Sequence, residues 1–150
     1  MRRAIALSNY CRGKLWRSGF SIWIIVIHSQ EDLTLLNNEL KDRVLLLHNG
    51  LIERENGEYY LLSFEANLDT DIPNASEVLT LNICKIINNL SPRSRQLWNQ
   101  SDRKVFDYGY ESGLQPSSFS NELSGKAIAK MASLEASIVT TIYPYQAEPN

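Results

Sequence analysis

The spacing of apolar positions changes along the chain, and these changes predict the order of strands and helices. Residues 22–27 form a continuous apolar run of strand length, typical of a central strand that is covered on both faces. From Leu33 onward, apolar residues recur at every third or fourth position, which predicts one helix reaching Leu47. The polar residues 48–50 would end this helix, with an asparagine or a glycine as its left-handed cap.

A β-hairpin is the next predicted unit. Asn56-Gly57 accepts the positive φ angles of a tight two-residue turn, so residues 51–62 should fold back on themselves. The second strand of the hairpin alternates through Tyr60, Leu62, Phe64 and Ala66.

The second half of the chain predicts helix, strand, helix and strand. Leu79, Ile83, Ile86 and Leu90 share one face of a helix, and Pro92 suits the first turn of a short further one. The remaining predicted elements are a strand over 104–111, a helix over 124–134 and a strand over 136–143.

This order predicts the fold class. The first six elements match the split βαβ, ferredoxin-like arrangement, and a helix and a strand extend it. We therefore expect an α+β domain over 21–145, with a mixed sheet and its helices on one face. A basic arm over 1–20 precedes this domain, and a short tail over 146–150 follows it.

Charge divides the chain unevenly. It has 150 residues and a net charge of −2, but residues 1–20 hold five basic residues and no acidic one. The rest of the chain carries ten basic residues against all 17 acidic ones. An acidic body of this kind repels nucleic-acid phosphates, so we expect no nucleic-acid partner.

The cysteines and the apolar run 22–27 bear on the cellular compartment of the protein. Cys11 and Cys84 form neither a disulfide framework nor a CxxC pair, which favours a reducing, cytosolic setting. The run 22–27 is far shorter than the roughly 20 residues that a membrane span needs. The basic leader before it suggests a secretory signal, but no small-residue cleavage site follows.

Metal and cofactor sites are not expected. His28 and His48 are the only histidines, and their spacing provides no convergent set of ligands. Asp69-Thr70-Asp71 is similar to the start of a calcium loop, but Pro73 occupies the next ligand position and no glycine follows. We interpret these acidic residues as a solvated loop that leads into a helix.

Catalytic motifs are also missing from the sequence. There is no phosphate-binding glycine loop and no G-x-S-x-G elbow, so no catalytic residue is assigned. Asp107 and Glu111 lie four residues apart on a strand, hence on one face, where we expect a solvent-facing pair. An enzyme with an unfamiliar site stays open as an alternative.

A second alternative is DNA binding. Residues 51–62 resemble the wing of a winged-helix domain, although that fold needs three helices before its wing. Four basic residues in the second half of the chain could form a small basic patch that contacts DNA beside this wing. Its members would be Arg93, Arg95, Arg103 and Lys104.

The C-terminal half resembles a family of small bacterial proteins known as domain of unknown function 4279. The similarity runs over residues 78–145, through the helix ending at 86–92, the strand 105–110, the helix around 128–134 and the strand 136–143. The resemblance implies a compact α+β protein and no known activity. Families of this style include immunity proteins for secreted toxins, which is an analogy of fold.

These observations favour a non-enzymatic protein-interaction module that could inhibit or accompany another protein. Tyrosine is enriched at interface hot spots, and nearby acids would steer a basic partner. The oligomeric state stays open. The predicted binding patch joins Glu65, Asp69, Asp71, Tyr110 and Glu111.

Deletion of Met1–Gly19 tests the predicted arm. The truncated chain should keep a cooperative unfolding transition, because the arm carries no amphipathic stripe. Thermal melts of both chains, followed by circular dichroism, measure this. An insoluble or molten truncated chain would show instead that the arm belongs to the core, with Trp16 as its first candidate contact.

Overall fold

The computed structural model describes residues 21–67, 72–111 and 120–144. Within these ranges five strands and four helices confirm the predicted α+β class. In chain order they are β1 (Ser21–Ser29), α2 (Thr34–Leu40), β2 (Val44–Arg54), β3 (Gly57–Ala66), α3 (Ala75–Asn88), α4 (Pro92–Gln100), β4 (Arg103–Glu111), α5 (Gly125–Ser133) and β5 (Ser137–Tyr143).

The sheet has the strand order β2-β3-β1-β4-β5. The β1 strand is antiparallel to β3 on one side and to β4 on the other, and β3 is antiparallel to β2. The β1 and β2 strands are therefore parallel, with β3 between them, which is the split βαβ arrangement. The β5 strand pairs in parallel with β4, so the C-terminal helix and strand extend this core as predicted.

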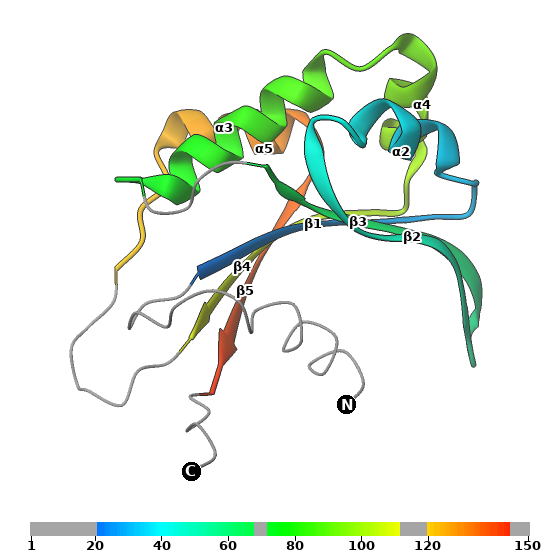
Figure 1. The fold of residues 1–150 in the computed structure, drawn as a ribbon, viewed down its shortest axis with the longest axis horizontal. Helices are drawn as coiled ribbons and strands as arrows, with labels where there is room; N and C mark the ends of the chain where they lie inside the picture. The colour runs from blue at the N-terminus through cyan, green and yellow to red at the C-terminus, as the bar shows by residue number, and fades with distance from the viewer. Residues whose placement is uncertain (1–20, 68–71, 112–119, 145–150) are drawn as a thin grey trace.

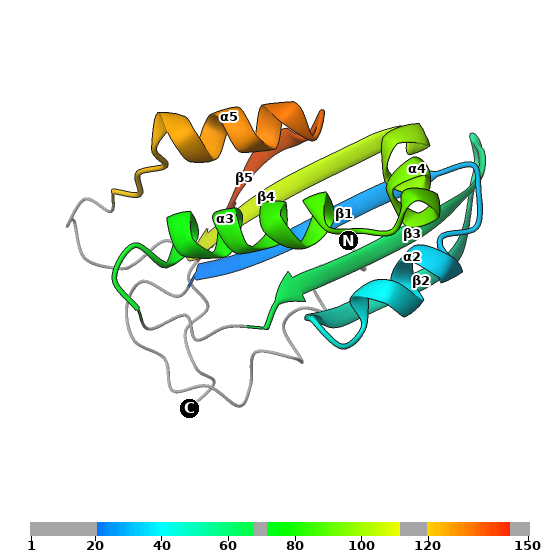
Figure 2. The same cartoon turned by 90° about the horizontal axis from the view of Figure 1, so that it is seen from above.

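The four described helices lie on one face of the sheet (Figure 1). Seen from above, α5 lies at the β5 edge and α2 at the β2 edge, with α3 and α4 between them (Figure 2). The β2–β3 hairpin extends beyond the helix layer and curves away from it (Figure 1). The hairpin forms as predicted, but its register pairs Arg54 with Gly57, so the turn residues are Glu55 and Asn56. Gly57 has a positive φ of 113°, whereas the φ of Asn56 is not positive, so the predicted turn with positive φ at both Asn56 and Gly57 does not form.

The core lies between the sheet and the helices. Ile25 and Ile27 of β1 point into it, together with Leu62 and Phe64 of the neighbouring β3. Ile22 and Ile24, on the opposite face of β1, are also buried. The prediction that residues 22–27 form a central strand covered on both faces is therefore confirmed.

The first predicted helix is too long. It ends at Leu40, and Val44–Leu47 already belong to β2. The apolar spacing from Leu33 to Leu47 fits a helix locally, but pairing with β3 claims its last part, and tertiary pairing outweighs local pattern. A register shift between Leu46 and His48 changes the pairing within the strand, so His48 lies in β2 and not at a helix end.

The apolar residues of the predicted helix over 124–134 and strand over 136–143 would be expected in the core, but two of them, Ile128 and Ile142, are exposed. Ile128 is 47% exposed, because the buried stripe of α5 passes through Ala127 and Met131 instead. Ile142 is 69% exposed, because β5 is an edge strand of the described sheet. Both errors follow from strand order and helix rotation, which spacing alone does not determine.

Replacement of Phe106 by alanine tests the assigned core face. The Phe106 side chain is 2% exposed and belongs to the main core cluster, so its loss should cost about 3–5 kcal/mol of unfolding free energy. Chemical denaturation measures the difference. Arg103→Ala, an exposed change on the same strand, is the control and should stay within about 0.5 kcal/mol of the original chain. An unchanged melting curve for Phe106→Ala would mean that the strand faces are assigned backwards.

Candidate functional site

The structure brings together only some of the five residues predicted to bind a partner. Glu65 and Glu111 lie on the sheet face that points away from the helices, since their strand neighbours Phe64 and Tyr110 pack towards the core. Tyr110 is therefore on the opposite face from the two glutamates. Asp69 and Asp71 lie outside the described residues. Tyr110 therefore does not share a surface with the two glutamates of the predicted patch. The binding role of the other members stays a prediction.

A carboxylate that the predicted patch did not include joins this face. Glu65 and Asp107 both pair with Ile24, one from each side, so their backbones are two strand spacings apart, about 10 Å. Asp107 Oδ1 accepts a hydrogen bond of 2.8 Å from the Thr141 hydroxyl of β5. Asp107 and Glu111 share a face as predicted, but both are half-buried and not fully solvent-facing.

Tyr110 belongs to a polar network between α3 and the segment before α5. Its hydroxyl accepts a hydrogen bond of 2.6 Å from Asn121 Nδ2. Asn121 Oδ1 in turn accepts a hydrogen bond of 2.5 Å from Ser76 at the start of α3. The ring of Tyr110 is half-buried, so truncation of this side chain would disturb the fold as well as any surface.

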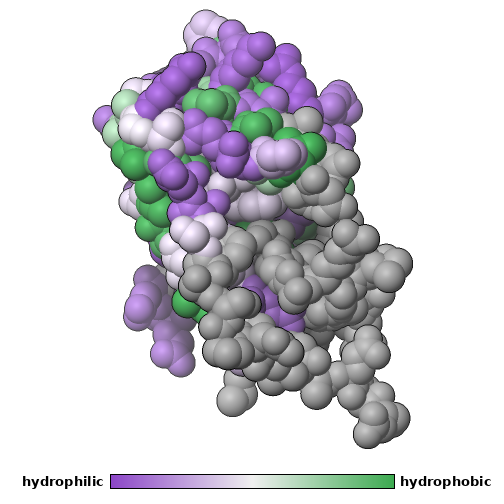
Figure 3. All heavy atoms as spheres, turned by 90° about the vertical axis from the view of Figure 1, so that its left-hand side faces the viewer, coloured by the Kyte–Doolittle hydropathy of each residue, from purple (hydrophilic) through white to green (hydrophobic). Residues whose placement is uncertain are grey.

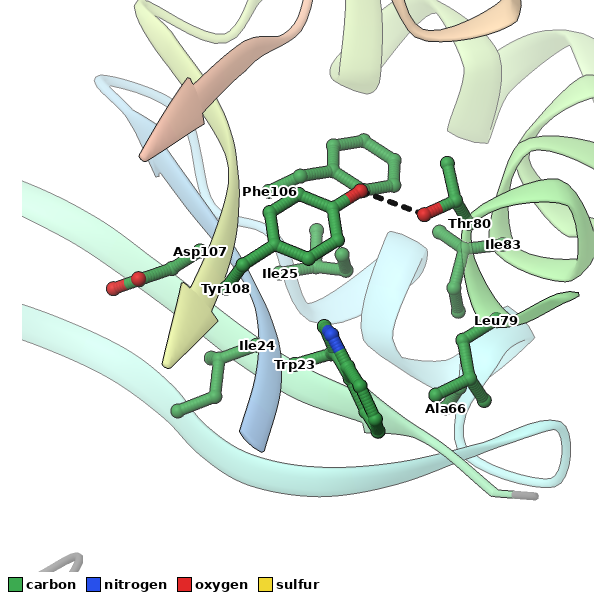
Figure 4. A pocket seen from close by; sticks show the side chains of 10 residues that line it. All are labelled: Trp23, Ile24, Ile25, Ala66, Leu79, Thr80, Ile83, Phe106, Asp107 and Tyr108. Atoms are coloured by element: carbon green, nitrogen blue, oxygen red, sulfur yellow. Dashed lines mark hydrogen bonds between the residues drawn. The ribbon is translucent and has the colours of Figure 1, made fainter. Parts of the chain in front are cut away.

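A pair of hydroxyl groups lies deeper in the same region. The Thr80 hydroxyl donates to the Ser76 carbonyl at 2.6 Å, so the Tyr108 hydroxyl, 2.6 Å away, donates to Thr80 (Figure 4). Burial raises the pKa of Tyr108 to about 12 and that of the Cys84 thiol to about 11. Both groups are therefore protonated at neutral pH and are poor nucleophiles. The hydrogen bond between Tyr108 of β4 and Thr80 of α3 therefore joins this helix to the sheet.

The cavity beside this pair is small. It lies between α3 and the sheet, and its volume of about 10 Å³ is close to the minimum that one water molecule occupies. Trp23, Leu79 and Tyr108 are among the side chains that line it (Figure 4). The Asp107 carboxylate points away from the Tyr108 and Thr80 hydroxyls, so the cavity contains no carboxylate–hydroxyl pair (Figure 4).

The two histidines lie on the sheet face opposite the helices. The ring of His28 stacks on Tyr59 with centroids 4.6 Å apart, and the Arg54 guanidinium carbon is 5.7 Å from the centroid of the same tyrosine ring. His48 lies two strands away from His28, on β2. Across the described ranges, no three histidine, cysteine, aspartate or glutamate side chains are grouped so that they could hold a metal ion.

Among the described residues, a hydroxyl lies closest to a carboxylate oxygen in two glutamate–serine pairs, but the serine of each pair caps a helix. Glu77 of α3 accepts hydrogen bonds from the Ser124 amide at 2.9 Å and the Ser124 hydroxyl at 2.5 Å. Glu39 of α2 accepts from the Ser91 amide at 2.6 Å and the Ser91 hydroxyl at 2.7 Å. Each serine is the N-cap of the following helix, α5 or α4, and accepts a hydrogen bond from that helix's first turn. The pairs therefore join α3 to α5 and α2 to α4.

Apolar side chains are exposed along both edges of the described sheet. On β2 they are Leu45, Leu46 and Leu51, between 37% and 46% exposed, and on β5 they are Ile138 and Ile142. Small hydrophobic groups also reach the surface between hydrophilic ones over the end of the molecule that Figure 3 shows. The sequence pattern missed these edge surfaces, because strand order decides which apolar residues stay uncovered.

Comparison with protein-family models, with curated proteins and with solved structures finds no match to this chain. The resemblance of residues 78–145 to the bacterial family therefore stays a prediction. In the part of the chain that the structure describes, no helix is both long and apolar enough to cross a membrane.

Glu77→Gln tests the role of the glutamate–serine pairs. Hydrogen bonds from the Ser124 hydroxyl and amide hold the pKa of Glu77 below its ordinary value of 4.5. The stabilisation is therefore present at neutral pH and is lost as pH falls from about 4.5 through the lower folded-state pKa. Glu77→Gln should lower the melting temperature at pH 7, and the difference should disappear at strongly acidic pH.

Matched variants separate this effect from a general loss of charge. Ser124→Ala removes the cap itself and should cost about 1 kcal/mol at pH 7. Glu55→Gln removes an exposed carboxylate at the hairpin tip and should leave the melting temperature nearly unchanged at every pH. If Glu77→Gln melts at the temperature of the original chain at pH 7, the pair does not stabilise the helix layer.

Proposed function

We propose that this protein is a non-enzymatic protein-interaction module that binds a basic protein partner along β2 and the tip of the β2–β3 hairpin. The observation that carries the proposal is that one sheet edge combines three exposed leucines with an acidic, projecting hairpin. We define the docking surface by Leu45, Leu46, Leu51, Glu53, Glu55 and Glu58.

The apolar part of the docking surface lies on an edge strand. The β2 strand pairs only with β3 among the described strands, so one side of its backbone faces no described strand. The α2 helix lies at the same edge (Figure 2), and its Leu35 is 48% exposed. Leu46 and Leu51 point to the helix side of the sheet, whereas Leu45 points to the other face. An open strand edge that exposes apolar side chains is typical of protein-binding sites.

The charged part of the docking surface is the hairpin tip. Glu53, Glu55 and Glu58 are exposed there, with Arg54 as the one basic residue between Leu51 and Tyr59. This charge projects beyond the helix layer, where it would attract a basic partner over a long range (Figure 1).

The same charge opposes the DNA-binding alternative. A wing that meets DNA approaches phosphates, and an acidic tip would be repelled by them. Two residues of the predicted basic patch also interact with other groups of the chain. The Lys104 side chain is buried, donates to the Asn99 carbonyl at 3.2 Å and lies 3.6 Å from Glu135. Arg95 donates to the Ile87 carbonyl at 3.2 Å and to Asn88 at 3.1 Å.

The proposal extends to how the module acts. By covering a basic surface of its partner, it would inhibit or accompany that protein without chemistry of its own. A cytosolic, bacterial setting is part of the proposal, and the free, buried thiol of Cys84 supports a reducing environment.

Two double variants test the docking surface after a partner has been captured from the source cells and purified. Glu55→Gln/Glu58→Gln should slow association by about tenfold at low salt and flatten its salt dependence. Leu46→Ala/Leu51→Ala should mainly speed dissociation and raise Kd by at least about tenfold, or 1.4 kcal/mol. Binding kinetics over a range of ionic strength measure both effects.

Glu65→Gln/Glu111→Gln is the matched control, since it removes the same number of charges from the other sheet face. It should leave association nearly unchanged. If this control weakens binding and the hairpin variant does not, the docking surface is wrong and the face predicted from the sequence is right. A purified chain that turns over a small molecule and captures no protein would overturn the proposal in favour of an enzyme.

A further inference from the structure

The opposite edge of the described sheet has different chemistry. The β5 strand reads Ser-Ile-Val-Thr-Thr-Ile-Tyr and pairs with β4 without interruption over its seven residues. It contains no proline, no charged residue and no register shift, which are the usual means by which an edge strand avoids pairing with another chain. Three of its seven residues are isoleucine or valine, so its composition also favours pairing.

The exposed apolar side chains of this edge share one face. Ile138 and Ile142 pair with Phe106 and Tyr110 of β4, which point to the helix side of the sheet. Ile138 is 47% exposed and Ile142 is 69% exposed. Thr140 lies midway between them, on the same face.

The α5 helix adds a second apolar surface at this edge (Figure 2). Its buried stripe consists of Ala127 and Met131, followed by Leu134 just after the helix. A second stripe with the spacing i, i+3, i+4 and i+7 is exposed and uncharged. Its members are Gly125, Ile128, Ala129 and Ala132. Small residues at these positions allow another helix to approach closely.

We propose that β5 is a homodimerisation edge, at which two copies of this chain join antiparallel β5 strands around a two-fold axis at Thr140. This register places Ile138 opposite Ile142 of the partner subunit, and Thr140 opposite Thr140 of the partner subunit. Opposed side chains of this kind have Cβ atoms about 4.5–5.5 Å apart, so the exposed isoleucines would cover each other. The contact is the same patch on both copies, as two-fold symmetry requires.

Self-complementarity selects a second copy as the occupant. The two isoleucines are spaced symmetrically around Thr140, so one copy presents to the other the side chains that it needs to cover. The strand carries no charge, so two copies do not repel each other there, and a charged partner finds no complementary group. The two-fold axis is normal to the sheet, which keeps both helix layers on the same side of the joined sheet and brings the two α5 helices towards each other.

This inference goes beyond the proposed function, since it concerns the other edge of the sheet. Dimerisation through β5 leaves the docking surface on β2 free. The two proposals can therefore fail separately.

Sedimentation equilibrium of the full-length chain tests the dimer over a concentration series from micromolar to millimolar. The interface of one strand and one helix is small, so a weak, reversible dimer is expected in this range. Ile138→Lys/Ile142→Lys should abolish it, because lysines would then oppose lysines. Ile138→Glu/Ile142→Glu should do the same. A mixture of the two variants should restore a dimer of one copy each, because every lysine then opposes a glutamate.

Disulfide trapping tests the register in a second, independent way. In a Cys11→Ser background, Thr140→Cys should form a cross-linked dimer readily, because the two cysteines oppose each other within disulfide range. Ser137→Cys is the matched control on the same strand. Its cysteines would lie about 20 Å apart in this register, six residues along an antiparallel pair, and should not cross-link.

Three results would overturn the proposal. They are a monomeric chain throughout the concentration series, a dimer that survives both charged double variants, and cross-linking of Ser137→Cys as fast as that of Thr140→Cys. Circular dichroism melts accompany each variant. Since Ile138 and Ile142 are exposed in the single chain, the charged variants should keep its fold, and the cysteine pair tests the register even if they do not.

Discussion

The antiparallel pairing of β1 with both β3 and β4 is the constraint on which the rest of this structure depends. Without β1, the β2–β3 hairpin and the β4–β5 pair would be two separate ribbons, and two-stranded ribbons are marginally stable in water. Isoleucines of β1 are buried on both faces of the sheet. Burial of each of these side chains contributes about 1.5–3 kcal/mol to the free energy of unfolding. On the helix side, Ile25 and Ile27 meet the layer that the glutamate–serine pairs join.

The central place of β1 also decides what the molecule presents to partners. With β1 in the middle, β2 and β5 become the edges of the described sheet, and each exposes large apolar residues. The two edges differ in charge: β2 leads into an acidic hairpin tip, whereas β5 carries no charged residue. We infer that they serve different contacts, a basic partner at β2 and a second copy at β5.

Local pattern predicted much of the fold. The apolar run 22–27 and the predicted strand over 104–111 each match an observed strand within a few residues. The Asn-Gly pair predicted the hairpin, although its turn lies one residue earlier than expected. The boundary between α2 and β2 was predicted wrongly, because the apolar spacing of residues 44–47 fits either element and pairing with β3 decides between them. The exposure of Ile142 depends on strand order, which is a property of the whole sheet, whereas the separation of Tyr110 from Glu111 follows from alternation along β4.

The candidate surfaces were harder to predict for the same reason. Glu65 and Asp107 are 42 positions apart in the sequence and flank one isoleucine of β1. Glu77 and Ser124 are 47 positions apart, and no local signal connects them. Long-range pairs of this kind become visible only once the strand register is known.

Site-resolved amide hydrogen exchange of the full-length protein, measured in dilute and in concentrated solution, tests whether β1 is the central strand and whether β2 and β5 are open edges. We expect the strongest protection in β1, β3 and β4, and fast exchange at alternate amides of β2 and β5 in dilute solution, because those amides point away from the paired strand. On concentration, the alternate amides of β5 should gain protection while those of β2 do not. Uniform protection of β2 or β5 in dilute solution would contradict the account, since that edge would then be covered within a single chain.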